Sequence, residues 1–309
     1  MHNRIAVVGS LNIDLVVQLD RMPAAGETVF GTTLERHPGG KGLNQAVAAA
    51  RLESEVHMIG AVGDDGSGDW LRDVVRREGI HSDGIATATG TSGTALIEVD
   101  NSGQNRIIVI PGANDGLLPE HATAAVAAMD RVDVVIGQFE IRQTVTTAAF
   151  TAAHERGAVS VLNPAPAAAV SDELAAVTDW LIPNEHEFAI IAAAAGLSDD
   201  VEDPAALVAF AEGLGVRLLV TLGERGAVIV GRDGKIRRVE TPTVDAVDTT
   251  GAGDAFVGAF AFGLASGRSE DSAARLGCAI AAESVLRPGT QKSFPDHARC
   301  RAIIAGVEE

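Results

Sequence analysis

The chain alternates short, almost wholly apolar runs with longer alanine-rich stretches, and this rhythm constrains the fold more than any other feature. The apolar runs predict strands at Ile5–Val8, Val56–Ile59, Val132–Gln138, Val159–Asn163, Trp180–Pro183, Leu218–Thr221 and Ala227–Val230. Runs without polar alternation are typical of strands buried on both faces of a helix-covered parallel sheet. Helices are predicted between them at Leu43–Leu52, Asp69–Glu78, Glu120–Met129, Gln143–Arg156, Glu185–Ala195, Pro204–Glu212, Ala255–Ala265 and Glu270–Leu286. The sequence therefore predicts an α/β fold with a doubly wound, mostly parallel central sheet flanked by helices.

Two stretches, about 13–36 and 91–110, depart from this rhythm. In the second, Thr94–Val99 and Arg106–Ile110 flank the turn sequence Asn101-Ser102-Gly103, which indicates a β-hairpin. Both stretches lie outside the strand–helix alternation, so we expect them to form a small separate sheet at one edge of the main body. We expect residues 1–309 to form one domain that carries this sheet as a lid.

Charge and composition exclude several function classes. The formal net charge of −18 argues against binding to nucleic acid, which requires clustered lysine and arginine. The uncharged stretch Ala255–Gly267 is shorter than the roughly 20 residues of a membrane span, and the N-terminus has no signal-peptide core. We therefore expect a cytoplasmic protein without a membrane or nucleic-acid partner.

The most informative motif is Asp248-Thr249-Thr250-Gly251-Ala252-Gly253-Asp254, which leads directly into the apolar stretch Ala255–Leu264. Glycines let the backbone approach a ligand closely, and the N-terminus of the following helix favours an anion. A carboxylate beside an anion site is electrostatically unfavourable, so Asp254 indicates a proton-abstracting base. A helix-capping aspartate is the alternative.

Three further polar motifs follow predicted strands or precede predicted helices. Gly39-Gly40-Lys41-Gly42-Leu43-Asn44 precedes a helix, and Asn12 and Asp14 follow the first strand, where open α/β sheets bind ligands. Both motifs fit a polyhydroxyl ligand, or else an ordinary loop and turn. Asn184 and Glu187 share one face of a starting helix, which fits either Mg²⁺ held through water or a simple cap.

Together these motifs closely resemble the ribokinase family of sugar kinases, in the phosphofructokinase B-type superfamily. The resemblance covers essentially the whole chain, and its motifs are Gly39–Ala46, Gly60–Asp65, Pro111–Asn114, Leu162–Pro166, Thr221–Gly226 and Asp248–Asp254. It implies ATP-dependent phosphorylation of a pentose, D-ribose at O5, with Asp254 as the catalytic base. It also implies that Gly251, Ala252 and Gly253 form the anion hole.

The same resemblance assigns binding positions. The sugar-side positions are Asn12, Asp14, Gly40, Lys41, Asn44 and Glu140. The nucleotide-side positions are Asn184, Thr221, Gly223, Gly226, Gly253 and Gly277, the last where relatives often carry a larger polar residue.

For metals, Glu187 belongs to the motif that organises Mg²⁺ and phosphate. A K⁺ site is implied at Asp248, Thr250, Ser284, Arg287, Gly289 and Ser293. Arg287 offers no side-chain acceptor, so only its carbonyl could serve. The two off-rhythm stretches match the family's β lid, which implies a homodimer formed through that lid.

Two alternatives to a ribose kinase stay open at this level. A related kinase of the family would act on a ketohexose, deoxyribose or a nucleoside, because the pocket lining sets that choice. A non-catalytic regulator that binds sugar or nucleotide would belong to a different class, but such a protein gains nothing from a base at Asp254.

Overall fold

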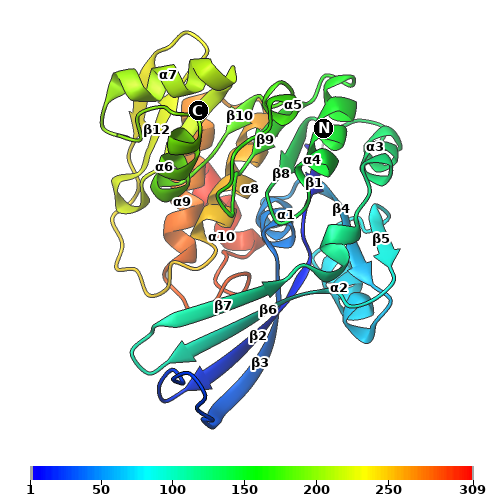
Figure 1. Cartoon of the computed structure of the whole chain (residues 1–309). Helices are drawn as coiled ribbons and strands as arrows, with labels where there is room; N and C mark the ends of the chain where they lie inside the picture. The colour runs from blue at the N-terminus through cyan, green and yellow to red at the C-terminus, as the bar shows by residue number, and fades with distance from the viewer. Residues whose placement is uncertain (1–2, 308–309) are drawn as a thin grey trace.

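The computed structural model describes residues 3–307. Within them, nine strands form the main sheet in the order β13-β12-β11-β10-β9-β8-β1-β4-β5 (Figure 1). These strands are β1 (Arg4–Val8), β4 (Glu55–Gly63), β5 (Ile85–Ala88), β8 (Val134–Gly137), β9 (Val159–Leu162), β10 (Trp180–Leu181), β11 (Arg217–Thr221), β12 (Ala227–Val230) and β13 (Ile236–Val239). Neighbours from β5 to β11 pair in parallel, which confirms the predicted mostly parallel sheet.

Helices cover both faces of this sheet. In β1, Ile5 and Val7 belong to one hydrophobic core and Ala6 and Val8 to the other, because successive side chains of a strand point to opposite faces. The first core includes residues of α1 (Lys41–Arg51), α2 (Gly66–Arg77), α8 (Ala252–Ala265), α9 (Glu270–Ser284) and α10 (His297–Gly306). The second includes residues of α3 (Pro119–Ala127), α4 (Gln143–His154), α5 (Asp172–Ala175), α6 (Glu185–Ala194) and α7 (Pro204–Leu214).

The structure departs from the predicted elements mainly at their ends. The apolar run Ala227–Val230 forms β12 but pairs antiparallel to β11, because only the short 3₁₀ turn η2 (Gly223–Arg225) joins the two strands. Strands β5 and β13, which form the two edges of the main sheet, and helix α10, which packs against α9, were not predicted. None of the helices within residues 3–307 is long and apolar enough to span a membrane.

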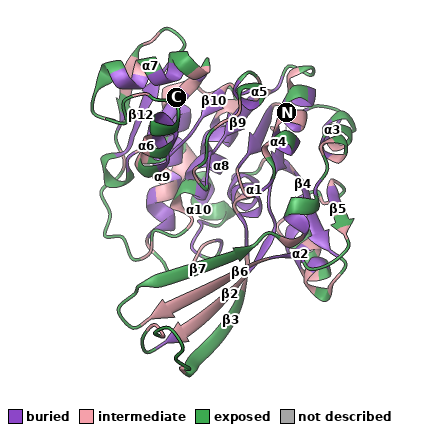
Figure 2. Ribbon diagram, viewed as in Figure 1, coloured by how far each residue is buried: buried purple, intermediate pink, exposed green. Residues whose placement is uncertain are grey.

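A second sheet, here called the small sheet, contains four strands in the order β3-β2-β6-β7. They are β2 (Asn12–Leu19), β3 (Gly31–Gly39), β6 (Gly93–Asp100) and β7 (Asn105–Ile110), so the two off-rhythm stretches do pair and the predicted hairpin is confirmed. This sheet projects from one end of the main body (Figure 1), and its residues are mainly half-buried or exposed (Figure 2). Strand β2 begins, and strand β3 ends, at the expected sugar site.

Candidate active site

Two helix N-termini meet beyond the carboxyl end of β1. Helix α1 begins after Gly40, whose φ of 89° is the left-handed conformation that favours glycine. The loop after β1 packs against the first turn of α1, since Leu43 N–H donates to the Ser10 carbonyl over 3.0 Å. A Cβ on Gly42 would lie 2.6 Å from the backbone of Ser10, so this contact requires glycine. The glycines of the Gly39–Asn44 motif therefore permit close backbone approach.

Asp254 lies in the first turn of α8, at this meeting point. Its carboxylate is buried, with 7% of the residue exposed, and it accepts hydrogen bonds from Asn44 Nδ2 and Gln45 Nε2, each at 2.9 Å. Burial raises the pKa of Asp254, while the Lys41 ammonium and the two amides oppose that rise. A buried carboxylate with a raised pKa beside polar ligand positions has the properties of a general base.

The entry to α8 supplies the amides of the expected anion hole. Gly251 caps the helix with a φ of 80°, and the Ala252 N–H turns inward to the Thr249 carbonyl at 3.2 Å. Among the described residues, the N–H groups of Gly253 and Asp254 have no acceptor. These two first-turn amides and the Gly251 N–H, for which no acceptor exists among the described residues either, are therefore available to an anion, whereas that of Ala252 is not.

Glu140 joins the sugar-side residues into one cluster. Its Oε2 accepts hydrogen bonds from Ser10 Oγ (2.6 Å), Asn12 Nδ2 (3.3 Å) and the Lys41 N–H (3.1 Å). Asn114 in turn donates to Asn12 Oδ1 over 2.7 Å and so fixes the orientation of the Asn12 amide. The structure thus brings Asn12, Lys41 and Glu140 together as the resemblance implied.

Asp14 extends the cluster onto the small sheet. Burial, together with the nearby Glu140 and Asp254 carboxylates, raises the pKa of Asp14 to about 7. A Cβ on Gly39 would lie 2.2 Å from the Asp14 carboxylate oxygens, so glycine at 39 makes room for this acid. Asp14 also lines a cleft of about 990 Å³ that runs between the small sheet and the loop containing Asp248.

Lys41 places a positive charge among the acids of the site. Burial alone would lower the pKa of Lys41, but the carboxylates of Asp254, Glu140 and Glu187 raise it, and the net shift is upward. Lys41 therefore stays charged and lies within electrostatic reach of both the sugar-side acids and the nucleotide-side Glu187.

On the nucleotide side, Asn184 and Glu187 form a capping box at the start of α6. The Asn184 side chain accepts from the Glu187 N–H at 2.8 Å, and Glu187 Oε2 accepts from the Asn184 N–H at 2.9 Å. The alternative of a helix cap is thus present, and burial raises the pKa of Glu187 despite that hydrogen bond. Asn184 also bridges to Thr221 at the end of β11, which brings two nucleotide-side positions together.

Glycine is required at the remaining nucleotide-side positions for different structural reasons. Gly223 begins η2 and Gly226 follows it, with φ values of 58° and 81°, and a Cβ on Gly226 would lie 2.0 Å from the Val239 carbonyl oxygen. Gly277 is buried in α9, where a Cβ would lie 2.8 Å from the ring of Phe256 on α8. The structure therefore gives Gly277 a role in packing α9 against α8.

The expected K⁺ positions lie in two neighbouring segments, the loop before α8 and the stretch from the end of α9 to Ser293. Asp248 accepts hydrogen bonds from Thr250 Oγ1 at 2.7 Å and from the Gly289 N–H at 2.8 Å, and these bonds lower the pKa of Asp248 against the effect of partial burial. The Arg287 guanidinium donates to the carbonyl of Ser293, another of these positions, at 3.0 Å, and because a guanidinium has no acceptor, only the backbone carbonyl of Arg287 could bind a cation. Ser284 and Ser293 donate their hydroxyl hydrogens to backbone carbonyls, which leaves their oxygen lone pairs available. Oxygen donors of this kind suit a hard monovalent cation.

Several side chains of the site were not predicted from the sequence. Gln45, Gln138, Asn163 and Gln291 are buried and connect to Asn44 or Asp254 through side-chain amides. Gln45 and Asn163 lie within quoted motifs, so the motif itself was the available signal. Nothing in local spacing indicates Gln138 or Gln291.

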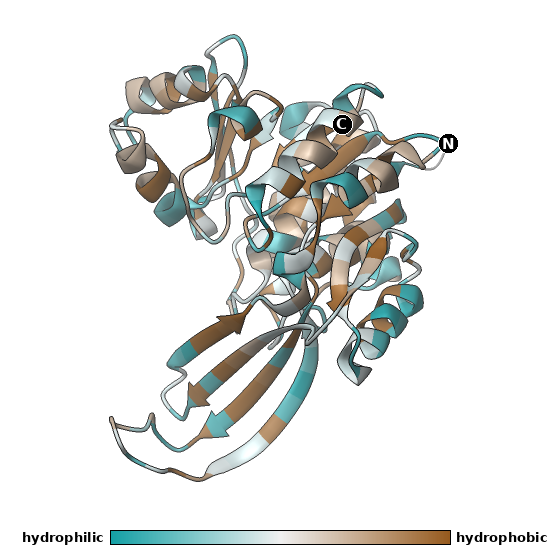
Figure 3. Cartoon of the chain, turned by 45° about the vertical axis from the view of Figure 1, so that its right-hand side comes forward, coloured by the Kyte–Doolittle hydropathy of each residue, from teal (hydrophilic) through white to brown (hydrophobic). Residues whose placement is uncertain are grey.

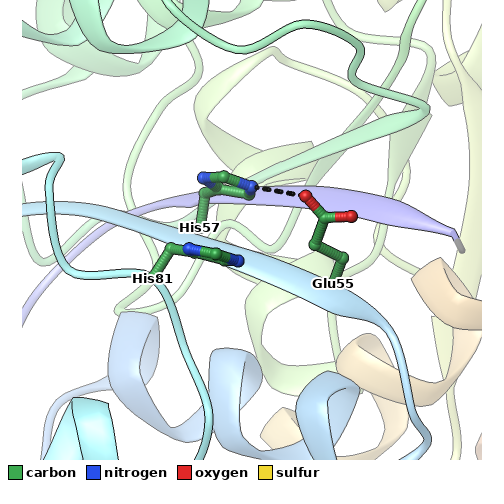
Figure 4. Close-up of side chains that lie close together, drawn as sticks. All are labelled: Glu55, His57 and His81. Atoms are coloured by element: carbon green, nitrogen blue, oxygen red, sulfur yellow. Dashed lines mark hydrogen bonds and ion pairs between the residues drawn. The ribbon is translucent and has the colours of Figure 1, made fainter.

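A separate cluster lies at the start of β4, where Glu55 and His57 meet His81 of the segment before β5 (Figure 4). The two imidazole rings stack with centroids 4.2 Å apart and planes inclined by 11°. Ring nitrogens of parallel imidazoles direct their lone pairs in parallel, so they do not converge on one ion. Glu55 is also paired with Arg4 at 2.9 Å, which explains this acid without a metal.

Comparison with known proteins agrees with this geometry. A family model described as pfkB family carbohydrate kinase matches residues 2–297. The chain is 39% identical to ribokinase from Bacillus subtilis over 302 residues, which are 97% of this chain and 99% of the relative. It is 36% identical to deoxyribokinase from Salmonella typhimurium over 296 residues, 94% of this chain and 95% of the relative.

Solved structures show the same architecture. Ribokinase from Thermotoga maritima superposes with a TM-score of 0.86 at 35% identity and covers 97% of this chain and 99% of its own. Arabidopsis thaliana ribokinase, solved with ribose and ATP, gives a TM-score of 0.89 at 30% identity and covers 98% and 99%. The chain therefore belongs to the pfkB family of carbohydrate kinases.

Proposed function

We propose that the protein transfers the γ-phosphate of ATP to O5 of D-ribose. The observation that carries the proposal is the 2.9 Å hydrogen bond from Asn44 to Asp254, which joins the polyhydroxyl-binding motif to the acid at the start of α8. Relatives named ribokinase at 35–39% identity over nearly the full chain support ribose as the acceptor.

In this mechanism Asp254 takes the proton of the sugar hydroxyl as that oxygen attacks the terminal phosphorus of ATP. The bond between this phosphorus and its bridging oxygen to the β-phosphate breaks, and ADP leaves. The free N–H groups of Gly253 and Asp254 stabilise the charge that develops on the transferred phosphoryl group. Lys41 lies near both the sugar-side acids and the nucleotide-side Glu187, and its positive charge helps to neutralise the charge on the transferred phosphoryl group. Positioning and electrostatics of this kind supply most of the catalysis in phosphoryl transfer.

Two metal ions belong to the proposal. Glu187 would help to hold Mg²⁺, which neutralises phosphate charge, because its buried carboxylate offers oxygen atoms of the kind that this ion prefers. The oxygens of Asp248, Thr250, Ser284, Arg287, Gly289 and Ser293 would hold K⁺. The hydrogen bond from the Gly289 N–H to Asp248 already joins the two segments of the chain that form that site.

The sugar is tested with a panel of acceptors and coupled detection of ADP. We expect kcat/KM to be highest for D-ribose among ribose, 2-deoxyribose, fructose and nucleosides. Because relatives also include deoxyribokinases, a preference for 2-deoxyribose would replace ribose as the substrate and keep the kinase mechanism. ADP release that is independent of every sugar would contradict the proposal.

We further propose that two copies pair through the small sheet, which would act as a lid over the sugar. Its strands contain hydrophobic residues among hydrophilic ones (Figure 3), and Leu34 and Ile108 are 68% and 57% exposed. The strand register places both on the same face, beside Val17 and Leu96. Light scattering should give a dimer mass for the wild type and a monomer mass for Ile108→Asp. Ile190→Asp, at an exposed apolar position on α6, is the matched control and should stay dimeric.

A further inference from the structure

A buried series of hydrogen-bonded side-chain amides, here called the amide chain, ends at the carboxylate of Asp254. Gln45 Nε2 donates to Asp254 Oδ1 at 2.9 Å and to Asn163 Oδ1 at 3.1 Å, while Gln138 Nε2 donates to Gln45 Oε1 at 2.7 Å. Gln45 and Gln138 are both 0% exposed. Neither side chain can therefore touch a substrate, in contrast to Asn44, which is 6% exposed.

The direction of these hydrogen bonds is fixed by the acid. An ionised carboxylate only accepts, so the Gln45 amide must present its nitrogen to Asp254 and its oxygen to Gln138. Gln138 must then present its own nitrogen to Gln45. One carboxylate thus sets the orientation of two successive amides.

The far end of the chain is left unsatisfied. Gln138 Oε1 is buried and has no hydrogen-bond partner among the described residues. It faces Gly9, where a Cβ would lie 2.1 Å away, so no side chain at that position separates the amide from the loop after β1. A buried carbonyl without a partner destabilises the fold, so this arrangement is not explained by stability alone.

We propose that Gln45, oriented by Gln138, is a positioning residue that holds the Asp254 carboxylate as an acceptor aimed at the sugar site. The inference rests on the proposed function, since it gives Asp254 the role of base. It adds a second support to the base, independent of Asn44, from residues that never contact the sugar.

Other charged groups also face Asp254. They come from different elements and are Lys41 on α1, Asp14 on β2, Glu140 after β8 and Glu187 on α6. All four are retained when Gln45 or Gln138 is replaced. A change in the pH–rate profile of such variants therefore reports the amide chain.

The test uses Gln45→Met, which keeps the length of the side chain but removes its donor. The acid limb of kcat/KM for ribose reports ionisation in the free enzyme. We expect this limb to move to higher pH by about one unit, because the carboxylate loses one charge-assisted hydrogen bond. We expect the rate to fall by up to roughly tenfold at pH values below the acid limb, with less loss at higher pH, and KM for ATP to stay within about twofold.

The double variant Gln45→Met/Gln138→Met separates positioning from packing. It also removes the Gln138 donor that the single variant leaves unpaired, so thermal stability should recover while the acid limb stays shifted. Gln143→Met makes the same change at a half-buried glutamine outside the site, which donates to the Ala169 carbonyl and accepts from the Ser171 N–H, and it should match the wild type in rate and profile.

An unshifted acid limb in a folded Gln45→Met enzyme would overturn the inference, as would full recovery of the rate and profile in the double variant. If Gln45→Met does not fold, the pH–rate profile of Gln138→Met tests the inference instead. It keeps the contact between Gln45 and Asp254, and we expect a smaller shift in the same direction, whereas no shift would refute the role. Wild-type protein that phosphorylates no sugar would instead overturn the proposed function, and with it the role of Asp254.

Discussion

Asn44 Nδ2 and Asp254 Oδ2 lie 2.9 Å apart although 210 positions separate the two residues in the sequence. Asn44 lies in α1, just after strand β3 of the small sheet, whereas Asp254 lies in the first turn of α8, in the second half of the chain. The hydrogen bond therefore fixes the proposed base against the part of the chain that carries the sugar-side residues. Any movement of α1 relative to α8 would separate the base from its substrate.

The first prediction is that Asp254→Asn lowers kcat by roughly 10²–10⁴ while the fold persists, since this is the range for loss of a general base. Asparagine keeps the size of the side chain, and circular dichroism should show an unchanged helix content. Asp69→Asn is the matched control, because Asp69 is exposed in the first turn of α2. Near-wild-type turnover of Asp254→Asn in steady-state kinetics would remove Asp254 from the role of base.

The start of α8 could be predicted from sequence because its signals are local. Glycine spacing and an acid just before an apolar run depend only on neighbouring residues, and the structure places Asp254 in the first helical turn as expected. The helix start at the sugar-side motif Gly39–Asn44 could be predicted for the same reason. Both are cases in which backbone chemistry alone determines the local conformation.

The contacts across the site could not be predicted in this way. Gln45 meets Gln138 across 93 positions because β8 lies beside β1 in the sheet, and periodicity does not report strand order. Glu140 came only from the family resemblance, since its contact with Lys41 depends on how the chain leaves β8. The antiparallel edge was missed because an apolar strand looks the same in either direction.

A second prediction concerns the entry to α8. Gly251→Ala should destabilise the fold by more than the ~1–2 kcal/mol of a left-handed alanine, because its Cβ would also lie 2.5 Å from Thr290 Cγ2. Gly267→Ala, at a φ of 76° with open space around it, should lose only the backbone contribution. Urea unfolding midpoints measure both changes.

The variants Gly251→Ala and Gly267→Ala should also differ in activity. Displacing the N-terminus of α8 moves the free amides and Asp254, so we expect kcat of Gly251→Ala to fall at least roughly tenfold, since small misplacements near a reacting group are costly. Gly267→Ala, beyond the other end of the helix, should keep its turnover. Equal activity and equal stability of the two variants would contradict this account of Gly251.

A third prediction is activation by K⁺. At constant ionic strength, the rate in K⁺ should exceed the rate in tetramethylammonium several-fold, because a bulky cation cannot fit among the oxygens around Asp248. Asp248→Asn should reduce this difference, since it removes the charge that Thr250 and Gly289 hold in place. Asp245→Asn, at an exposed position three residues earlier, is the control. Equal rates in the two cations would refute the site.

A fourth prediction follows from the pKa of Asp14, which is raised to about 7 by burial and by the neighbouring Glu140 and Asp254. In the unfolded chain an aspartate titrates near about 4, so between about pH 4 and 7 the folded state binds the proton more tightly. The stability contributed by protonated Asp14 is therefore present at low pH and is lost as the pH rises through about 7.

Asp14→Asn removes this titration and keeps a neutral side chain at every pH. The melting temperature of the variant, relative to wild type, should therefore increase by a few degrees between about pH 5 and pH 8. Asp20→Asn, at the exposed position just beyond the end of β2, should show no such trend. Melting curves of wild type and Asp14→Asn that shift in parallel with pH would show that Asp14 ionises in the folded protein as it does in water.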